Sequence, residues 1–180
     1  MPRLGGRSRL ALAAACLLAA ASPHAGVYTG ATLGATTTIT AHCTIATSAV
    51  SFGQYDPVAA NRTAKLDAAG TVTIRCVRAT APTIALGLGL HATGSTRRMQ
   101  GPGPSDFLSY ELYHPSSINP NAACPPSGTV VWGAGGASLF SPTAAGNFNA
   151  RTYNVCGTVF AGQDPVIGSY SDTVTATVNF

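Results

Sequence analysis

Apolar and polar residues alternate along several stretches of the chain, and this two-residue period is typical of β-strands that bury one face. The clearest stretch is 170–180, where polar residues occupy one face. The other face carries the apolar residues Val174, Ala176, Val178 and Phe180. Three earlier stretches alternate in the same way, at 70–76, 83–90 and 107–113. The pattern therefore predicts a chain built mainly of strands.

The first alternation runs from Val27 to Ile45 and is longer than an ordinary strand of about five or six residues. Its odd-numbered positions include Thr29, Ala31 and Leu33, with mostly small or polar residues between them. We therefore expect its first part, 26–36, and its second part, around 39–45, to have different partners.

Segments rich in turn-forming residues separate these stretches. Residues 56–70 are expected to form a loop or one short helix, and 114–149 is irregular, with many Pro, Gly, Ser and Asn residues. Because the sequence has no convincing amphipathic helix and no repeat, it predicts one all-β domain, an antiparallel sandwich of the immunoglobulin-like kind. A barrel is the structural alternative.

The N-terminus has the features of a secretory signal peptide. Three arginines precede an apolar run over 10–21, and small residues follow as far as Gly26. We expect residues 1–25 to be the signal peptide, with cleavage between 21 and 26; lipidation at Cys16 fits less well. The run is too short to span a bilayer, which needs about 20 residues.

Removal of this segment changes the charge of the chain. Three of the ten basic residues leave with it and all six acidic residues remain, so the mature protein carries a net charge of +1. Such a balance favours neither nucleic acid nor an acidic membrane surface as a partner. The only adjacent basic pair, Arg97 and Arg98, is expected to be solvated.

Four cysteines remain after processing: Cys43, Cys76, Cys124 and Cys156. In an exported protein an even number of cysteines indicates disulfides, here two, for which three pairings are possible. We favour Cys43 with Cys76 and Cys124 with Cys156, each pair closing a short loop and stabilising the fold by about 3 to 4 kcal/mol. A zinc site is disfavoured because there is no C-x-x-C pair and the histidines are scattered.

The sequence offers little for catalysis. The few acidic residues lie mostly beside Gly, Pro or Ser in apparent turns, and no G-x-S-x-G motif occurs. We therefore expect no enzymatic activity and no cofactor. Trp132 and several tyrosines could line a sugar-binding surface, but aromatic residues at strand spacing more often pack in a core.

Several strings, in order, resemble one family. They are "CTI" at 43–45, "VSFGQYDP" at 50–57, "GTVTIRC" at 70–76, "RRM" at 97–99, "LSYELY" at 108–113, "VWG" at 131–133 and "VFAGQDPVIGSYSDTVTATVNF" at 159–180. Together they resemble the spore coat protein U domain family, which includes subunits of archaic chaperone-usher pili. Cys124 and Cys156 depart from the family pattern and suggest an added disulfide.

The resemblance implies a sandwich over 37–180 that lacks its last strand, so that a groove stays open beside the C-terminal strand. The groove edge would carry Val174, Ala176, Val178 and Phe180. The extension 26–36 would be a donor strand for another subunit, with Val27, Thr29, Ala31 and Leu33 on its inward face. Covering an open sheet edge with a strand from a partner is β-augmentation.

The partners implied by the resemblance are a periplasmic chaperone, an outer-membrane usher and further pilin subunits of the same or another kind. The chain would pass through the periplasm to the cell surface and polymerise there into a pilus or coat for adhesion and biofilm formation. The alternative function is a surface-binding module, lectin-like or a tip adhesin, suggested by Trp132 and the long irregular region.

Overall fold

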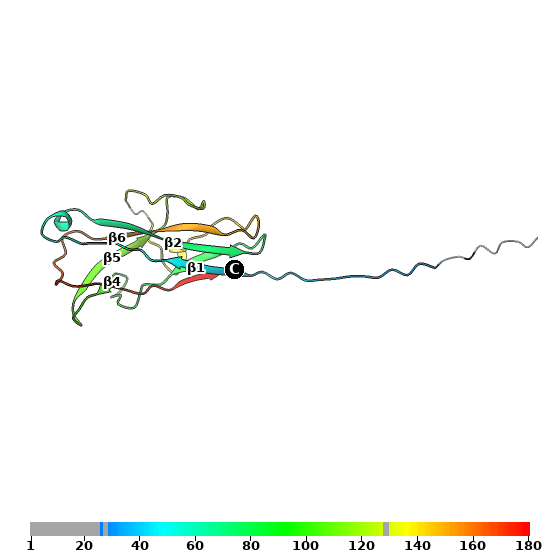
Figure 1. The fold of residues 1–180 in the computed structure, drawn as a ribbon, viewed down its shortest axis with the longest axis horizontal. Coiled ribbons are helices and arrows are strands. Elements are labelled where there is room, and N and C mark those ends of the chain that lie inside the picture. Colours follow the sequence, from blue (N-terminus) through cyan, green and yellow to red (C-terminus); the bar gives the residue numbers. More distant parts are fainter. Residues whose placement is uncertain (1–25, 27–28, 128–129) are drawn as a thin grey trace, which may run out of the picture. The chain divides into compact units, whose positions relative to one another are not determined.

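The computed structural model describes residues 26, 29–127 and 130–180, and the chain divides into two units, Met1–Thr37 and Thr38–Phe180. In the first unit, residues 26 and 29–37 are exposed and form neither helix nor strand. The expected signal peptide and the position of Val27 lie outside the described residues. The second unit is the folded domain shown in Figure 1.

The domain is an antiparallel sandwich of two separate sheets and not a closed barrel. Its strands are β1 (Cys43–Ser48), β2 (Leu66–Cys76), β3 (Thr83–Leu86), β4 (Arg97–Gln100), β5 (Phe107–Tyr113), β6 (Arg151–Val159) and β7 (Ala176–Asn179). One sheet has the order β1-β2-β6-β5-β4, and the other pairs β3 with β7. The short 3-10 helices are η1 (Ala60–Arg62) and η2 (Gly136–Ser138).

The first domain strand begins later than the sequence pattern suggested. β1 starts at Cys43, which is paired with Cys76 of β2. Ile39, which was expected near the start of this strand, is exposed. β2 ends at Cys76, so the residues before Cys43 have no residue of β2 to pair with. β2 itself starts at Leu66, within the stretch that was expected to be a loop or short helix.

Aromatic side chains fill the space between the sheets. The rings of Trp132 and Phe140 lie 4.8 Å apart, those of Phe140 and Tyr153 lie 5.1 Å apart, and all three residues are buried. The indole N–H of Trp132 donates a 2.9 Å hydrogen bond to the carbonyl oxygen of Ile84 in β3. Trp132 is therefore a core residue, as the spacing of the aromatics favoured.

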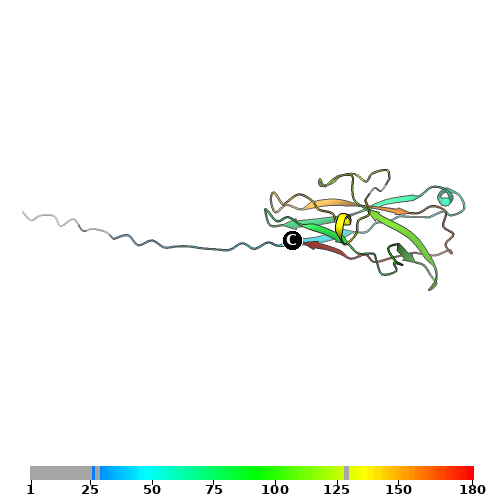
Figure 2. The same cartoon turned by 180° about the vertical axis from the view of Figure 1, so that it is seen from behind.

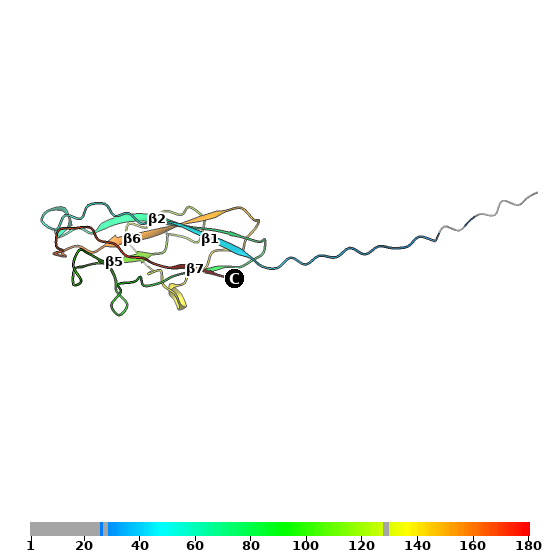
Figure 3. The ribbon, with the colours of Figure 1, turned by 60° about the horizontal axis from the view of Figure 1, so that its bottom comes forward.

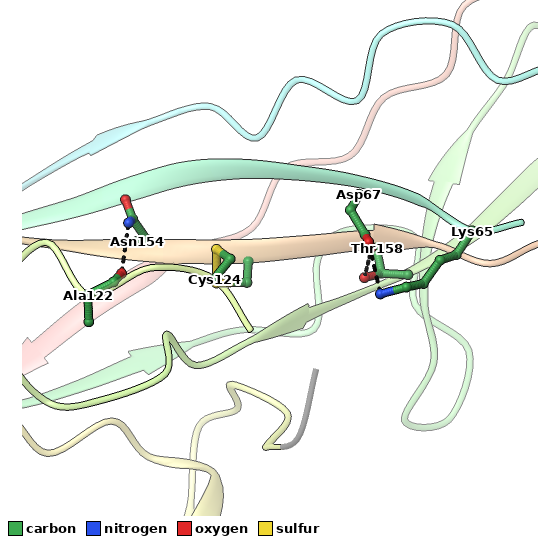
Figure 4. Close-up of a disulfide and its surroundings, with 7 residues drawn as sticks. Lys65, Asp67, Ala122, Cys124, Asn154 and Thr158 are labelled. Carbon is green, nitrogen blue, oxygen red and sulfur yellow. Dashed lines mark hydrogen bonds and ion pairs between the residues drawn. A yellow bond between two sulfur atoms is a disulfide. The ribbon is translucent and has the colours of Figure 1, made fainter. Parts of the chain in front are cut away.

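Both disulfides have the pairing favoured from the sequence. Cys43–Cys76 joins β1 to β2, and Cys124–Cys156 attaches the long connection between β5 and β6 to β6 itself. Figure 2 shows the domain from behind, with β5 and η2 in view. Figure 4 shows the second disulfide. Beside it Asn154 donates a 2.8 Å hydrogen bond to the carbonyl oxygen of Ala122.

Arg97 is fully buried, so the expectation that it is a solvated surface residue is wrong. Its guanidinium donates hydrogen bonds of 2.7 Å to the carbonyl oxygens of Gly87 and Trp132 and forms an ion pair with Glu111. A buried arginine is tolerated only where its charge and its donors are satisfied in this way. Arg97 therefore connects β4 and β5 to the end of β3.

Within the described residues, no helix has both the length and the apolar character needed to cross a membrane. The same part of the chain contains no cluster of three His, Cys, Asp or Glu side chains placed to hold a metal ion.

Candidate functional site: an open groove between β1 and β7

A groove of about 940 Å³ lies between the β1 side of the domain and the segment that leads into β7. One wall is formed by residues 47–57 and the other by 165–174 together with Ala176. The floor carries apolar side chains of the strands beneath, namely Val72, Leu86, Leu108, Leu112, Val155 and Val159. Figure 3 shows β1 and β7 on this side of the domain.

The groove walls continue the two strands, and of the strands themselves only Thr47 and Ser48 of β1 and Ala176 of β7 line the groove. β1 pairs only with β2 and β7 only with β3, and the described chain places no strand between β1 and β7. A row of unpaired backbone N–H and C=O groups along the free edge of a strand can bind a further strand. The site therefore combines an apolar floor with two edges that can form hydrogen bonds.

The wall that leads into β7 keeps the alternation seen in the sequence. Val174, Ala176 and Val178 are half-buried against the core, and the threonines between them are exposed. Val174 and Ala176 line the groove, whereas Val178 packs on the core beside it. Phe180 is 56% exposed, and its ring lies 6.4 Å from that of His42 at the end of the wall.

The residues expected to form the donor strand lie in the other unit of the chain. Thr29, Ala31 and Leu33 are exposed and belong to no strand, and Leu33 is 97% exposed. Burial of a leucine side chain is favourable by about 1.5 to 3 kcal/mol. A contact that buried Leu33 would therefore be stabilised by about this amount.

Within the wall formed by residues 47–57, Val50 and Phe52 approach β6 closely. A Cβ atom at Gly157 would lie 2.6 Å from Val50 Cγ1 and 2.7 Å from the ring of Phe52. A side chain at position 157 would therefore displace both residues. The ring of Phe52 in turn lies 6.0 Å from that of Tyr110 on the floor, in an edge-to-face arrangement.

The polar contact that fixes the other wall was not expected from the sequence. Asp172 accepts a 2.7 Å hydrogen bond from the hydroxyl of Tyr110 and a 2.9 Å bond from the backbone N–H of Leu90. Gly89, with φ of +91°, makes room for this carboxylate, since a Cβ there would lie only 1.9 Å from Asp172 Oδ2. Burial and the hydrogen bond to Asp172 raise the pKa of Tyr110 well above its usual range.

The model of the Spore Coat Protein U domain matches residues 29–177. The chain belongs to this family. "Protein U" of Myxococcus xanthus is 33% identical to it over 183 residues, which are 94% of this chain and 95% of that protein. The residues that match the family model therefore include both the extension from Thr29 onward and the residues that line the groove.

A solved structure has the same fold. It is a chain in the crystal structure of the CsuC–CsuE chaperone–tip adhesion subunit pre-assembly complex from archaic chaperone-usher Csu pili of Acinetobacter baumannii. The TM-score is 0.54 at 24% sequence identity, over 79% of this chain and 41% of that chain. The present chain thus spans less than half of that chain. The likeness identifies the sandwich as immunoglobulin-like.

In this Spore Coat Protein U domain the groove is suited to binding a peptide strand. Its lining is mostly apolar and aromatic. Both carboxylate oxygens of Asp172 accept hydrogen bonds from within the domain. The chemistry available to a ligand is therefore burial of alternate side chains on the floor and backbone hydrogen bonding at the edges.

Proposed function

We propose that this protein is a structural subunit that polymerises by donor-strand exchange into a pilus or surface coat. The single observation that carries the proposal is the open apolar groove between the segment that follows β1 and the segment that leads into β7, since neither strand pairs with a further strand on that side. The groove is filled by the segment 26–36 of a second copy or by the corresponding segment of a related subunit. Before assembly, a periplasmic chaperone covers the groove, and an outer-membrane usher exports the growing polymer.

The segment 26–36 has the composition that such a groove requires. Thr29, Ala31 and Leu33 alternate with small or polar residues, so a strand formed by this segment presents one face to the groove floor. Its few apolar side chains gain about 1.5 to 3 kcal/mol each on burial, and each backbone hydrogen bond adds about 0.5 to 1.5 kcal/mol. The sum over a strand of this length supports a long-lived joint between subunits.

The comparisons support the same proposal. The solved structure that shares the fold is a chaperone–subunit complex of chaperone-usher pili, and this chain belongs to the Spore Coat Protein U domain family. We place the assembled polymer at the cell surface, where it serves in adhesion and biofilm formation.

The alternative function, a surface-binding module that is lectin-like or a tip adhesin, was suggested by Trp132 and the long irregular region. Trp132, Tyr110 and Tyr153 are buried, so none of them can stack on a sugar. Trp132 and Tyr153 instead pack with Phe140 in the core, which favours the structural role.

The test uses substitutions on the two faces of the extension. The variant Leu33→Asp places a charge on the inward face and should abolish linear polymers when the full chain is secreted with its chaperone and usher. The matched control Thr32→Asp places the same charge on the opposite face and should still polymerise.

Electron microscopy of the secreted material and the ladder of bands on unheated denaturing gels report the result. Deletion of 26–36 should have the same effect as Leu33→Asp. Polymers of normal length from the deletion variant would show that the donor is not this segment.

A further inference from the structure

Two loops at one end of the groove have related sequences. Phe52–Val58 reads "FGQYDPV" and follows β1, and Phe160–Val166 reads "FAGQDPV" and follows β6. Both loops lie at the end of the domain that carries η1, opposite the carboxyl terminus (Figure 1). Pro57, Pro165, Val166 and Ile167 all line the groove there.

Hydrogen bonds lock the two loops together. The hydroxyl of Tyr55 donates a 3.0 Å bond to the carbonyl oxygen of Phe160 and accepts a 3.1 Å bond from the backbone N–H of Gln163. The side-chain amide of Gln163 exchanges two hydrogen bonds, of 2.7 and 2.9 Å, with the backbone of Ser109 in β5. The loops are therefore fixed to the sheet.

The buried side chain of Asn61 fixes the first loop in the same way. Its Oδ1 accepts a 2.8 Å bond from the backbone N–H of Asp56, and its Nδ2 donates a 3.0 Å bond to the carbonyl oxygen of Ala64. The carbonyl oxygen of Asn61 also accepts a 2.9 Å bond from the backbone N–H of Gly162 in the second loop. Buried, fully bonded polar groups of this kind hold a loop in one conformation.

This rigid support presents apolar side chains to solvent. Val58 is 83% exposed and Ile167 is 95% exposed, and Val166 is exposed beside them. We call these residues, with Pro57 and Pro165, the loop platform. Exposed apolar side chains on a fixed scaffold that continues a binding groove mark an interaction surface.

The charges at the two ends of the domain are complementary. Asp56 and Asp164 flank the loop platform. The basic residues that follow in the chain are Arg62 and Lys65, and Lys65 is paired with Asp67 at 2.8 Å. The N–H groups of Ala59 and Val58 hold the pKa of Asp56 below its usual value, so this side chain is charged at neutral pH.

The opposite end of the domain carries the exposed arginines Arg75 and Arg78, close to the pair Cys43–Cys76 where β1 begins. The exposed ring of Phe180 lies at the same end, against His42. This end thus offers an apolar side chain with basic neighbours, and the loop platform offers apolar side chains with acidic neighbours.

We infer that the loop platform is the docking surface for a second copy of this chain, which contacts it with the end that carries Phe180, Arg75 and Arg78. The inference rests on the proposed function. Residues 37–42 connect the donor segment to β1, and six residues span at most about 20 Å. A donor segment that leaves the groove beside the platform therefore brings the Cys43 end of its own domain against the platform.

This arrangement has two structural consequences. The donor strand runs parallel to β1 and antiparallel to β7. The contact joins unlike ends of two identical domains, so each added subunit presents a fresh platform, and the assembly grows as an open filament.

The test is cross-linking within polymers of the full-length protein. Ile167→Cys combined with Phe180→Cys in one chain should give disulfide-linked ladders between neighbouring subunits, because these positions lie at opposite ends of one domain and meet only across the contact. The matched control is Ile118→Cys with Phe180→Cys, since Ile118 is an exposed apolar residue on the connection between β5 and β6. The control should give several-fold less linkage.

A second variant tests the surface without new cysteines. Val58→Ser with Ile167→Ser should leave polymers that form but bend more freely, with a persistence length reduced several-fold in micrographs. Normal polymers in which the Ile167→Cys and Phe180→Cys pair links no more than the control would overturn the docking surface alone. Absence of polymers from the unaltered chain would overturn the proposed function as well.

Discussion

The hydroxyl of Tyr110 donates a 2.7 Å hydrogen bond to the carboxylate of Asp172, and this contact attaches the segment before β7 to the floor of the groove. The two residues are 62 positions apart in the chain. Because Tyr110 belongs to the larger sheet and Asp172 leads into the smaller one, the contact sets the position of one groove wall relative to the floor.

Tyr110→Phe removes this hydroxyl and keeps the ring. We expect it to lower the free energy of unfolding by about 1 to 3 kcal/mol, since Asp172 loses a partner in a partly buried position. It should also make the polymers dissociate at a lower temperature, because the groove wall is less firmly held. Chemical denaturation and the heating of polymers before electrophoresis measure the two effects.

The control for this variant is Thr158→Val. Thr158 donates a 2.6 Å hydrogen bond to Asp67, so the same kind of hydroxyl–carboxylate contact is lost, but neither residue lines the groove (Figure 4). Thr158→Val should change the stability of the domain without changing the dissociation of polymers. Equal effects of both variants on polymers would mean that the contact at Tyr110 acts only through overall stability.

Gly89→Ala should be more damaging than an ordinary glycine substitution. Its φ of +91° is unfavourable for alanine, and the added Cβ would lie 1.9 Å from Asp172 Oδ2. Gly94→Ala is the matched control, because Gly94 also has a positive φ, +57°, but has nothing within 4 Å of the added Cβ. We expect about 1 kcal/mol of destabilisation from the control and a further loss of about 1 to 3 kcal/mol at Gly89, measured by chemical denaturation. Similar losses at both positions would contradict the role assigned to Asp172.

The parts of this fold that the sequence predicts are those with one buried face. The strand at 107–113 was predicted with its observed bounds, because its apolar residues alternate without interruption and turn residues precede it. In 83–90 the alternation continues beyond the strand. β3 ends at Leu86, where its pairing with β7 stops, and the chain turns at Gly89.

Other elements have no such signal. In β6 the residues from Val155 to Val159 are all buried, because the connection held by Cys124 covers part of the outer face while the core covers the inner one. A strand buried on both faces loses the two-residue period. The roles of Arg97 and Asp172 depend on partners far along the chain, and neither composition nor periodicity reveals such contacts.

Arg97→Met should be strongly destabilising, by about 3 to 5 kcal/mol. It leaves the carboxylate of Glu111 without a cation and the carbonyl oxygens of Gly87 and Trp132 without their donor. Adding Glu111→Gln should recover part of the loss, because the unpaired buried charge is then removed.

The neighbouring residue provides the control. Arg98 stacks on the ring of Phe107 at 3.9 Å and is only half-buried, so Arg98→Met should cost about 1 kcal/mol or less. Chemical denaturation of the three variants measures these differences. A cost at Arg97 no larger than that at Arg98 would contradict the account of the buried ion pair.

His114 should make the stability of the domain depend on pH. Its ring lies 5.3 Å from that of Trp132 and 5.2 Å from that of Phe140, and burial there lowers its pKa below the usual 6.5, although the hydrogen bond with the carbonyl oxygen of Ser138 acts in the opposite direction. A histidine whose pKa is lower in the folded state stabilises the fold above its unfolded pKa and loses this contribution as the pH falls toward the folded pKa.

We therefore expect the melting temperature to fall as the pH decreases below about 6.5. His114→Gln, which cannot be protonated, should flatten this part of the profile. A profile with the same slope in the variant and the unaltered protein would assign the pH dependence to other groups.

The most direct measurement of the central claim is a cross-link between the donor segment and the groove. One copy of the full chain carries Leu33→Cys and a second copy carries Val174→Cys, and the two are secreted together with the chaperone and usher. The control replaces Val174→Cys with Thr177→Cys, since Thr177 is exposed on the opposite face of β7. We predict disulfide-linked pairs between the two copies for position 174 and not for position 177. Polymers that form without a link at position 174 would contradict the proposal that the extension of one subunit fills the groove of the next.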